Sequence, residues 1–202
     1  MGIWVAQTSD AATFAALLSD RERQALAQHG GLRRQQQTCW GLRRAVLSQR
    51  LGPNFRLKRL ASGQLICPGG PHLSASHSDA MVAIALHDDA PIGVDVEAVD
   101  RAVDGARIAA RYLPPAEQEW LKADPARFLP HWTIKEAVLK AMGLGIGGNV
   151  GRFVVLGQKM IETPEDWQEP LHWRLRVDRC CDHWVASATT GEPLGAPMVW
   201  QS

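Results

Sequence analysis

Apolar and polar residues alternate strictly along one short stretch in the middle of the chain. Ile92, Val94 and Val96 fall on every second position, a period typical of a β-strand with one apolar face. Asp95 and Glu97 fall on the positions between them. The pattern therefore predicts a strand that packs its apolar side chains on a core and presents two carboxylates on the opposite face.

A second stretch, from about residue 126 to 142, follows the period of an α-helix. Trp132, Glu136 and Lys140 recur at intervals of four residues and form one stripe along it. A second, apolar stripe would seat the helix on a sheet and consists of Ile134, Val138 and Ala141. Glycines follow at once and predict its end. A glutamate four residues before a lysine is also the favoured order for a solvent-exposed ion pair, which the sequence alone leaves open.

A serine-rich stretch around His77 precedes a continuous apolar run over residues 81–86. The run predicts a buried strand, and the stretch before it predicts a turn. Ser76, His77 and Ser78 carry groups that could donate hydrogen bonds to phosphate oxygens, and an ordinary polar turn is the alternative. The sequence has no G-x-S-x-G nucleophile elbow and no G-x-x-x-x-G-K-[ST] phosphate loop.

Helical and strand patterns occupy separate parts of the chain. We expect a strand at residues 1–9, helices over 12–50, strands over 54–97, helices over 101–142 and strands over 150–200. Separate runs of helices and strands are typical of an α+β fold. Since 46% of the 202 residues are hydrophobic, the chain can bury a core of its own.

Charge and cysteine content narrow the function classes. The net charge of about +1 gives no overall field that would attract nucleic acid. No run of about 18 apolar residues predicts a membrane span, and the first residues lack the features of a signal peptide. The four cysteines lack metal-site spacing, and we expect the adjacent pair Cys180 and Cys181 to stay reduced. We therefore expect a cytoplasmic monomer that binds neither nucleic acid nor membrane.

Three carboxylates from these segments, Asp95, Glu97 and Glu136, would suit one hard cation. Mg²⁺ prefers oxygen ligands and usually binds one or two carboxylates together with substrate phosphates. A lysine beside such a site indicates a phosphate-bearing substrate. For Asp95 and Glu97, the acidic solvent face of an edge strand is the alternative.

Together and in this order, the motifs S-H-S, I-G-V-D-V-E and W-T-I-K-E-A-V-L-K-A-M-G resemble the 4′-phosphopantetheinyl transferase superfamily, in particular its Sfp-like, pseudo-dimeric branch. The resemblance implies an α+β fold of two similar lobes, each a small, mostly antiparallel sheet packed with a long helix, and a coenzyme A cleft between them. The N-terminal lobe would span residues 1–100 and carry the basic helices, the S-H-S turn and the D-x-E strand. The C-terminal lobe would span residues 101–202 and carry the acid–lysine helix.

The resemblance also implies a reaction. The 4′-phosphopantetheine arm of coenzyme A would move to a serine of an apo acyl or peptidyl carrier protein, and adenosine 3′,5′-bisphosphate would leave. Mg²⁺ would neutralise and orient the diphosphate. The carrier is expected to be acidic, and we expect it to meet basic residues that follow the acidic strand, namely Arg101, Arg107 and Arg111.

Site residues follow from the same resemblance. Asp95, Glu97 and Glu136 would bind Mg²⁺, and the coenzyme A phosphates would be contacted by His77, Ser76 and Lys140. Arginine binds phosphate through paired donors, and the candidates on the N-terminal helices are Arg23, Arg33, Arg34 and Arg44. The general base stays open between Glu136 and Glu117, and Lys140 would assist catalysis.

Two departures from the family pattern concern phosphate binding. Gln64 stands where many relatives have a lysine, and Leu144 where they often have a basic residue, so both changes would weaken the hold on coenzyme A. Two other classes of function stay open. One is a different Mg²⁺-dependent phosphotransfer or pyrophosphate-cleaving enzyme, and the other is a catalytically silent relative that binds coenzyme A or a carrier.

Overall fold

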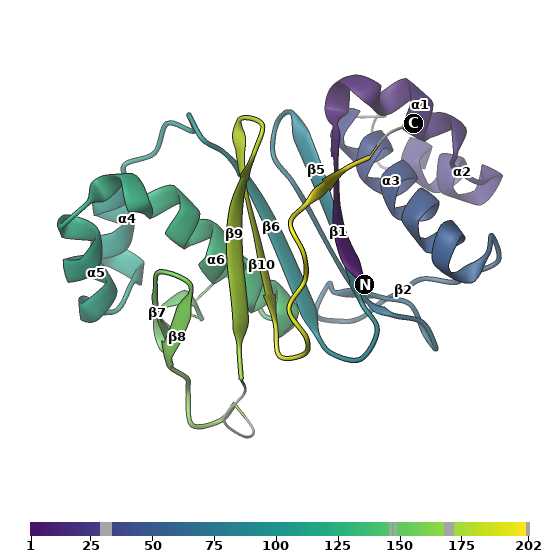
Figure 1. The fold of residues 1–202 in the computed structure, drawn as a ribbon. Helices are drawn as coiled ribbons and strands as arrows, with labels where there is room; N and C mark the ends of the chain where they lie inside the picture. Colours follow the sequence, from purple (N-terminus) through teal and green to yellow (C-terminus); the bar gives the residue numbers. More distant parts are fainter. Residues whose placement is uncertain (29–33, 146, 148, 168–171, 201–202) are drawn as a thin grey trace.

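The computed structural model describes residues 1–28, 34–145, 147, 149–167 and 172–200 (Figure 1). The α+β fold expected from the sequence is confirmed, with small, mostly antiparallel sheets packed against helices. In Figure 1 the two larger sheets stand in the middle of the molecule, with the early helices on one side and the later helices on the other. Within the described ranges, no helix has the length and apolar character that crossing a membrane requires.

The first half of the chain builds a sheet with the strand order β11-β1-β5-β4. Its strands are β1 (Gly2–Gln7), β4 (His72–His77), β5 (Met81–His87) and β11 (Met198–Val199). Three helices follow β1, namely α1 (Ala11–Ala16), α2 (Asp20–Gln28) and α3 (Arg34–Leu51), and α3 lies against β1, β4 and β5. A short hairpin precedes β4 and consists of β2 (Lys58–Arg59) and β3 (Leu65–Ile66). Strand β11 returns from the C-terminal part of the chain and runs parallel to β1.

The second half builds a sheet with the strand order β6-β10-β9. Its strands are β6 (Ile92–Ala98), β9 (Arg174–Cys180) and β10 (His183–Thr189), all antiparallel to their neighbours. Its helices are α4 (Gly105–Tyr112), α5 (Pro115–Lys122) and α6 (Phe128–Ala141), and α6 packs on all three strands. A second hairpin consists of β7 (Val154–Leu156) and β8 (Lys159–Glu162).

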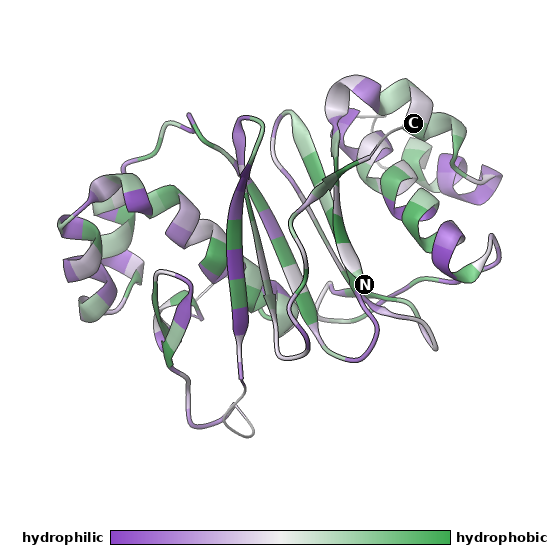
Figure 2. Ribbon diagram, in the orientation of Figure 1, coloured by the Kyte–Doolittle hydropathy of each residue, from purple (hydrophilic) through white to green (hydrophobic). Residues whose placement is uncertain are grey.

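The core lies in three layers. One apolar layer joins α3 to the first sheet, a second joins the two sheets to each other, and a third joins the second sheet to α6. The apolar residues of β6, which are Ile92, Val94 and Val96, belong to the layer between the sheets, as the alternating pattern predicts. In Figure 2 green predominates along β5, whereas β9 alternates between purple and green and the helices carry both colours. Helix α6 covers the other face of β6, so both faces of this strand are buried.

The strand and the helix predicted from periodicity are confirmed as β6 and α6. The prediction that the S-H-S segment forms a turn is wrong for Ser76 and His77, which belong to the strand β4, paired along its length with β5, and only Ser78 lies in the connection between the two strands. Serines fit in this buried strand since β6 supplies their partners. The Ser74 hydroxyl accepts a hydrogen bond from the Val94 backbone N–H at 3.0 Å, and the Ser76 hydroxyl donates one to Asp95.

Gly93 of β6 allows helix α6 to approach the strand closely. A Cβ atom at residue 93 would lie 1.8 Å from the carbonyl oxygen of Ala137 and 2.6 Å from the backbone nitrogen of Ala141. No real Cβ atom tolerates such distances, so only glycine fits between strand and helix. The contact fixes how far α6 stands from β6, and therefore which side chains of the two elements can touch.

Replacing Gly93 by alanine should force α6 away from β6, because the clashing atoms belong to the helix backbone and cannot turn aside. We expect Gly93→Ala to lower the free energy of unfolding by about 1–3 kcal/mol or more, as overpacked cores do, measured by urea denaturation. The matched control is Gly195→Ala, where a Cβ atom would meet nothing within 4 Å. Equal stability of the two variants would show that the close approach is not a constraint.

Candidate metal centre and adjoining pocket

Three carboxylates from β6 and α6 converge on one point. Ligand oxygens of Asp95, Glu97 and Glu136 all lie within 4.8 Å of one another. Asp95 and Glu97 are two residues apart and so share a face of β6, and α6 covers that face with Glu136. The structure thus brings together the three acidic side chains that the sequence suggested as metal ligands.

Asp95 has one paired and one unpaired oxygen. The residue is only 3% exposed. Its Oδ1 accepts hydrogen bonds from the Ser76 hydroxyl and from the Lys140 ammonium, each at 2.7 Å. Its Oδ2 is buried and has no hydrogen-bond partner among the described residues. A buried carboxylate oxygen without a partner is costly, and a bound cation would satisfy it.

Lys140 and Glu136 do not form the surface ion pair that their spacing allows. Lys140 reaches across to Asp95 on β6, and its Nζ also lies 2.7 Å from the Ser76 hydroxyl. Glu136 accepts a hydrogen bond from the indole Nε1 of Trp132 at 2.6 Å. The stripe predicted along α6 therefore faces β6, and it is not a solvated salt bridge.

Negative charge accumulates at this cluster and alters its ionisation. Burial raises the pKa of Glu136 to about 7, and the charge of Asp95 adds to the rise. The pKa of Glu97 is also raised, first by burial and then by Asp95, although Arg101 pairs with Glu97 and opposes the shift. Carboxylate oxygens are the ligands that Mg²⁺ prefers, and a divalent cation would relieve the repulsion among them. The donor set fits a hard divalent cation.

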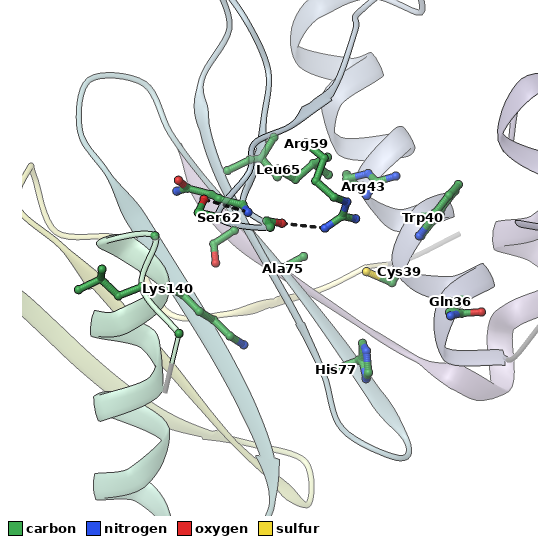
Figure 3. A pocket seen from close by; sticks show the side chains of 17 residues that line it. Gln36, Cys39, Trp40, Arg43, Arg59, Ser62, Leu65, Ala75, His77 and Lys140 are labelled. Carbon is green, nitrogen blue, oxygen red and sulfur yellow. Dashed lines mark hydrogen bonds between the residues drawn. The ribbon is translucent and has the colours of Figure 1, made fainter. Parts of the chain in front are cut away.

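A pocket of about 440 Å³ opens beside the carboxylate cluster (Figure 3). Its walls come from α3, the β2–β3 hairpin, β4 and the C-terminal end of α6. Figure 3 shows Lys140 entering from α6 on one side and Arg43 from α3 on the other. The basic residues that line the pocket are Arg43, Arg59, His77 and Lys140. No acidic residue is among the described residues of its lining, so the pocket suits an anionic ligand.

Arg43 was not among the residues proposed from the sequence. It is 6% exposed, and its Nε has no hydrogen-bond partner in the described part of the chain. Its guanidinium lies 5.2 Å from the ring centroid of Trp40. Cys39, Trp40 and Arg43 recur at helical spacing along the face of α3 that lines the pocket. Arg44 follows Trp40 by one helical turn as well, so the spacing alone could not separate Arg43 from Arg44, and only the packing of α3 does.

Three of the four arginines proposed from the sequence lie away from the pocket lining. Arg23 and Arg44 form ion pairs with acidic residues of α2, at 2.6 and 3.1 Å, and neither lines the pocket. Arg34 is an exposed residue at the start of α3 and does not line the pocket either. Arg33 lies outside the described residues. The phosphate-binding role proposed for Arg23, Arg34 and Arg44 therefore has no support in their placement.

Ser76 and His77 take separate places because successive residues of a strand face opposite ways. His77 lines the pocket and is exposed. The Ser76 hydroxyl is directed at Asp95 and Lys140 in the carboxylate cluster. The sequence suggested that both the Ser76 hydroxyl and the His77 imidazole contact coenzyme A. Only the His77 imidazole lines the pocket.

Glu117 lies in a buried ion pair apart from the carboxylate cluster. Its side chain has no exposed surface, and its Oε1 accepts hydrogen bonds from Lys135 Nζ at 2.8 Å and from the Val155 backbone N–H at 2.6 Å. Burial lowers the pKa of Lys135 to about 8. A side chain without exposed surface cannot touch a substrate, so Glu117 joins α5 to α6 and β7 and is not placed as a general base.

Removing the cation of this pair should be costly. We expect Lys135→Met to lower the free energy of unfolding by about 3–5 kcal/mol, because it removes the ammonium from Glu117 Oε1 and leaves only the His131 imidazole, 3.2 Å from Oε2, beside the buried carboxylate. Urea denaturation measures the loss, and adding Glu117→Leu should recover most of it. Lys159→Met changes an exposed lysine and should stay within about 0.5 kcal/mol of the parent. If Lys135→Met behaves like this control, the pair has no structural role.

Comparison with known proteins points to one family. Residues 91–189 match the family model of the 4′-phosphopantetheinyl transferase superfamily. The matched segment contains Asp95, Glu97, Glu136 and Lys140, so all the carboxylates of the cluster fall inside it. The resemblance inferred from the sequence motifs is therefore confirmed over this segment.

Curated relatives with similar sequences bear the same name. The chain is 34% identical over 103 residues to 4′-phosphopantetheinyl transferase psf-1 of Bacillus pumilus, and the aligned segment covers 46% of this chain and 43% of the relative. It is 34% identical over 89 residues to 4′-phosphopantetheinyl transferase HetI of Nostoc sp., covering 42% and 38%. It is 34% identical over 80 residues to 4′-phosphopantetheinyl transferase gsp of Aneurinibacillus migulanus, covering 37% and 32%. The similarity thus spans less than half of each of these relatives.

Proposed function

We propose that this chain acts as the 4′-phosphopantetheinyl transferase that its residues 91–189 resemble. It transfers the phosphopantetheine arm of coenzyme A to a serine of an apo acyl or peptidyl carrier protein and releases adenosine 3′,5′-bisphosphate. The observation that carries this proposal is the convergence of Asp95, Glu97 and Glu136 beside a basic pocket. The names of the relatives support the same activity.

The three carboxylates would hold Mg²⁺, which supplies neutralisation and orientation of a diphosphate when bound. The chain's own cations do the rest of the binding. Arg43 and Arg59 would hold phosphates within the pocket, and His77 and Lys140 would hold those nearest the carboxylates. Each of these four side chains lines the pocket, so an anion bound there would face all of them.

Transfer requires that the serine hydroxyl lose its proton as its oxygen bonds to the β-phosphorus of coenzyme A. The bond from that phosphorus to the bridging oxygen breaks, and adenosine 3′,5′-bisphosphate departs. Glu136 is the candidate base, since it lies in the cluster and is only half-buried, whereas Glu117 has no exposed surface. Lys140 lies close enough to the cluster to offset charge on the phosphates.

The two-lobe arrangement belongs to the same proposal. Each half has a sheet with a long helix packed on it, α3 in the first and α6 in the second. The pocket takes its walls from both halves, which favours coenzyme A binding between them. The division was expected near residue 100. Strand β6 is hydrogen-bonded to β10, so strand pairing favours a division ahead of residue 92, with the carboxylates of β6 in the second lobe.

The acceptor would be an acidic carrier protein that docks next to the carboxylates. An apolar cavity of about 660 Å³ lies between α4, α5 and the start of α6, with Phe128 and Trp184 in its wall. Arg101, which pairs with Glu97, and Lys122 stand at its edge. An apolar depression with a basic rim fits a partner that combines acidic and apolar side chains. Arg107 of α4 is exposed nearby and adds to the positive charge.

The transfer reaction is tested by the intact mass of apo carriers incubated with coenzyme A and Mg²⁺. We expect a gain equal to one phosphopantetheine arm with the parent protein. Glu136→Gln should lower the rate by about 100-fold or more, because it removes both a metal ligand and the candidate base. Glu162→Gln, which changes an exposed carboxylate on β8, is the matched control and should keep full activity.

Other outcomes of this assay identify the other classes of function. Release of phosphate from nucleotides without a carrier would point to a hydrolytic or phosphotransfer enzyme. Tight binding of coenzyme A without any mass gain on carriers would point to a binding protein. Either result would replace the proposed transfer.

Carrier docking is tested by charge reversal on α4. Arg107→Glu should lower kcat/KM for the carrier about tenfold at low ionic strength and flatten its salt dependence, because electrostatic steering is lost. The KM for coenzyme A should not change. Lys159→Glu makes the same charge change on β8 and should leave both constants near those of the parent. An unchanged rate and salt profile for Arg107→Glu would exclude docking at α4.

A further inference from the structure

Lys140 belongs to two sites at once. Its ammonium lies 2.7 Å from Asp95 Oδ1 and 2.7 Å from the Ser76 hydroxyl, inside the carboxylate cluster. The same side chain lines the anionic-ligand pocket (Figure 3). It is 31% exposed, whereas the Asp95 side chain is 4% exposed. The ammonium therefore stands at the boundary between a buried cluster and an open pocket.

In the carboxylate cluster, Lys140 acts as a counterion. Asp95, Glu97 and Glu136 contribute three carboxylates, and the cations paired with them are Arg101 on Glu97 and Lys140 on Asp95. A divalent cation drawn to these oxygens would meet the ammonium already bound to Asp95. Like charges repel strongly where burial lowers the local dielectric constant. The divalent cation and the Lys140 ammonium therefore destabilise each other when both are in the cluster.

The pocket offers the Lys140 ammonium a second position when an anion is bound there. Lysine carries its charge on a flexible stem, so Lys140 can turn from Asp95 into the pocket that it lines. The pocket already holds Arg43 and Arg59, and no acidic residue is found among the described residues of its lining. Without a bound anion, the move would add a third positive charge to the pocket and leave Asp95 with the Ser76 hydroxyl but without a cation. With phosphates in the pocket, the same move gains an ion pair.

We propose, relying on the proposed function for the identity of the donor, that Lys140 couples the binding of the divalent cation to the binding of coenzyme A. In the free protein Lys140 neutralises Asp95, and in the complex it pairs with donor phosphates while the metal ion takes its place. Each ligand therefore raises the affinity for the other by the same factor, as linkage requires. Coupling between sites typically amounts to about 5–150-fold in affinity.

Direct contact between metal and phosphate adds to this coupling, and a thermodynamic cycle separates the two contributions. Mn²⁺ serves as the probe, and its dissociation constant is measured by electron paramagnetic resonance with and without coenzyme A. Three proteins are compared: the parent, Lys140→Met, and the control Lys159→Met, which removes an exposed positive charge on β8.

Without coenzyme A, we expect Lys140→Met to bind Mn²⁺ about tenfold or more tightly than the parent, because the competing ammonium is gone. We expect coenzyme A to tighten Mn²⁺ binding less in Lys140→Met than in the parent. Lys159→Met should match the parent in both measurements. If Lys140→Met binds Mn²⁺ as weakly as the parent, or more weakly, without coenzyme A, the coupling role of Lys140 is overturned.

Loss of the counterion can also destabilise the fold, since Asp95 would be left buried without a partner charge. In that case Mn²⁺ alone should restore the near-ultraviolet circular dichroism of Lys140→Met, because the metal replaces the missing charge. Failure to restore it would also overturn the coupling role. Carrier modification by the parent is measured separately. If the parent modifies carriers but Lys140→Met does not bind Mn²⁺ more tightly, the coupling role of Lys140 is rejected and the proposed transfer activity stands.

Discussion

The backbone contact between α6 and β6 determines the geometry of the candidate site. Gly93 offers no side chain where Ala137 and Ala141 press on the strand, so the helix rests directly on it. At that separation Glu136 meets the carboxylates of β6, and Lys140 reaches Asp95. A helix standing off by the width of one methyl group would separate these groups. The cluster therefore depends on a residue that takes no part in its chemistry.

Charge balance is the second constraint on this site. Burial and the charge of Asp95 raise the pKa values of Glu136 and Glu97, and the positive charges of Lys140 and Arg101 oppose the rise. The adjoining pocket has the opposite character, since its charged side chains are basic. A site for a cation thus borders a site for an anion, and Lys140 connects them. This arrangement suits a substrate whose phosphates must bind a metal ion and basic side chains at the same time.

The helix motif W-T-I-K-E-A-V-L-K contains two lysines with different tasks. Lys135 has no exposed surface and joins Glu117 in a buried ion pair, while Lys140 serves the carboxylate cluster. Lys135 and Glu136 are adjacent in sequence, yet α-helical rotation turns them toward different surroundings. One motif thereby anchors α6 in the core of the second half and presents its functional side chains to β6. Separating these tasks is necessary before mutations in the motif are interpreted.

Local periodicity was sufficient for β6, α6, the α+β fold and the shared strand face of Asp95 and Glu97, because side-chain direction within one strand or helix follows from spacing along the chain. The approach of Glu136 to these two carboxylates was expected from the family resemblance of the motifs. Periodicity was insufficient for β4, because its serine-rich sequence is typical of a turn. The hydrogen-bond partners that allow these serines to be buried come from β6. The pocket arginines were also missed, since Arg43 and Arg59 line the pocket while Arg23 and Arg44 pair with α2. Which face of α3 meets a pocket, and whether Lys140 binds Glu136 or Asp95, depends on elements distant in sequence. Only packing brings those elements into contact, and so only the tertiary structure could decide these partners.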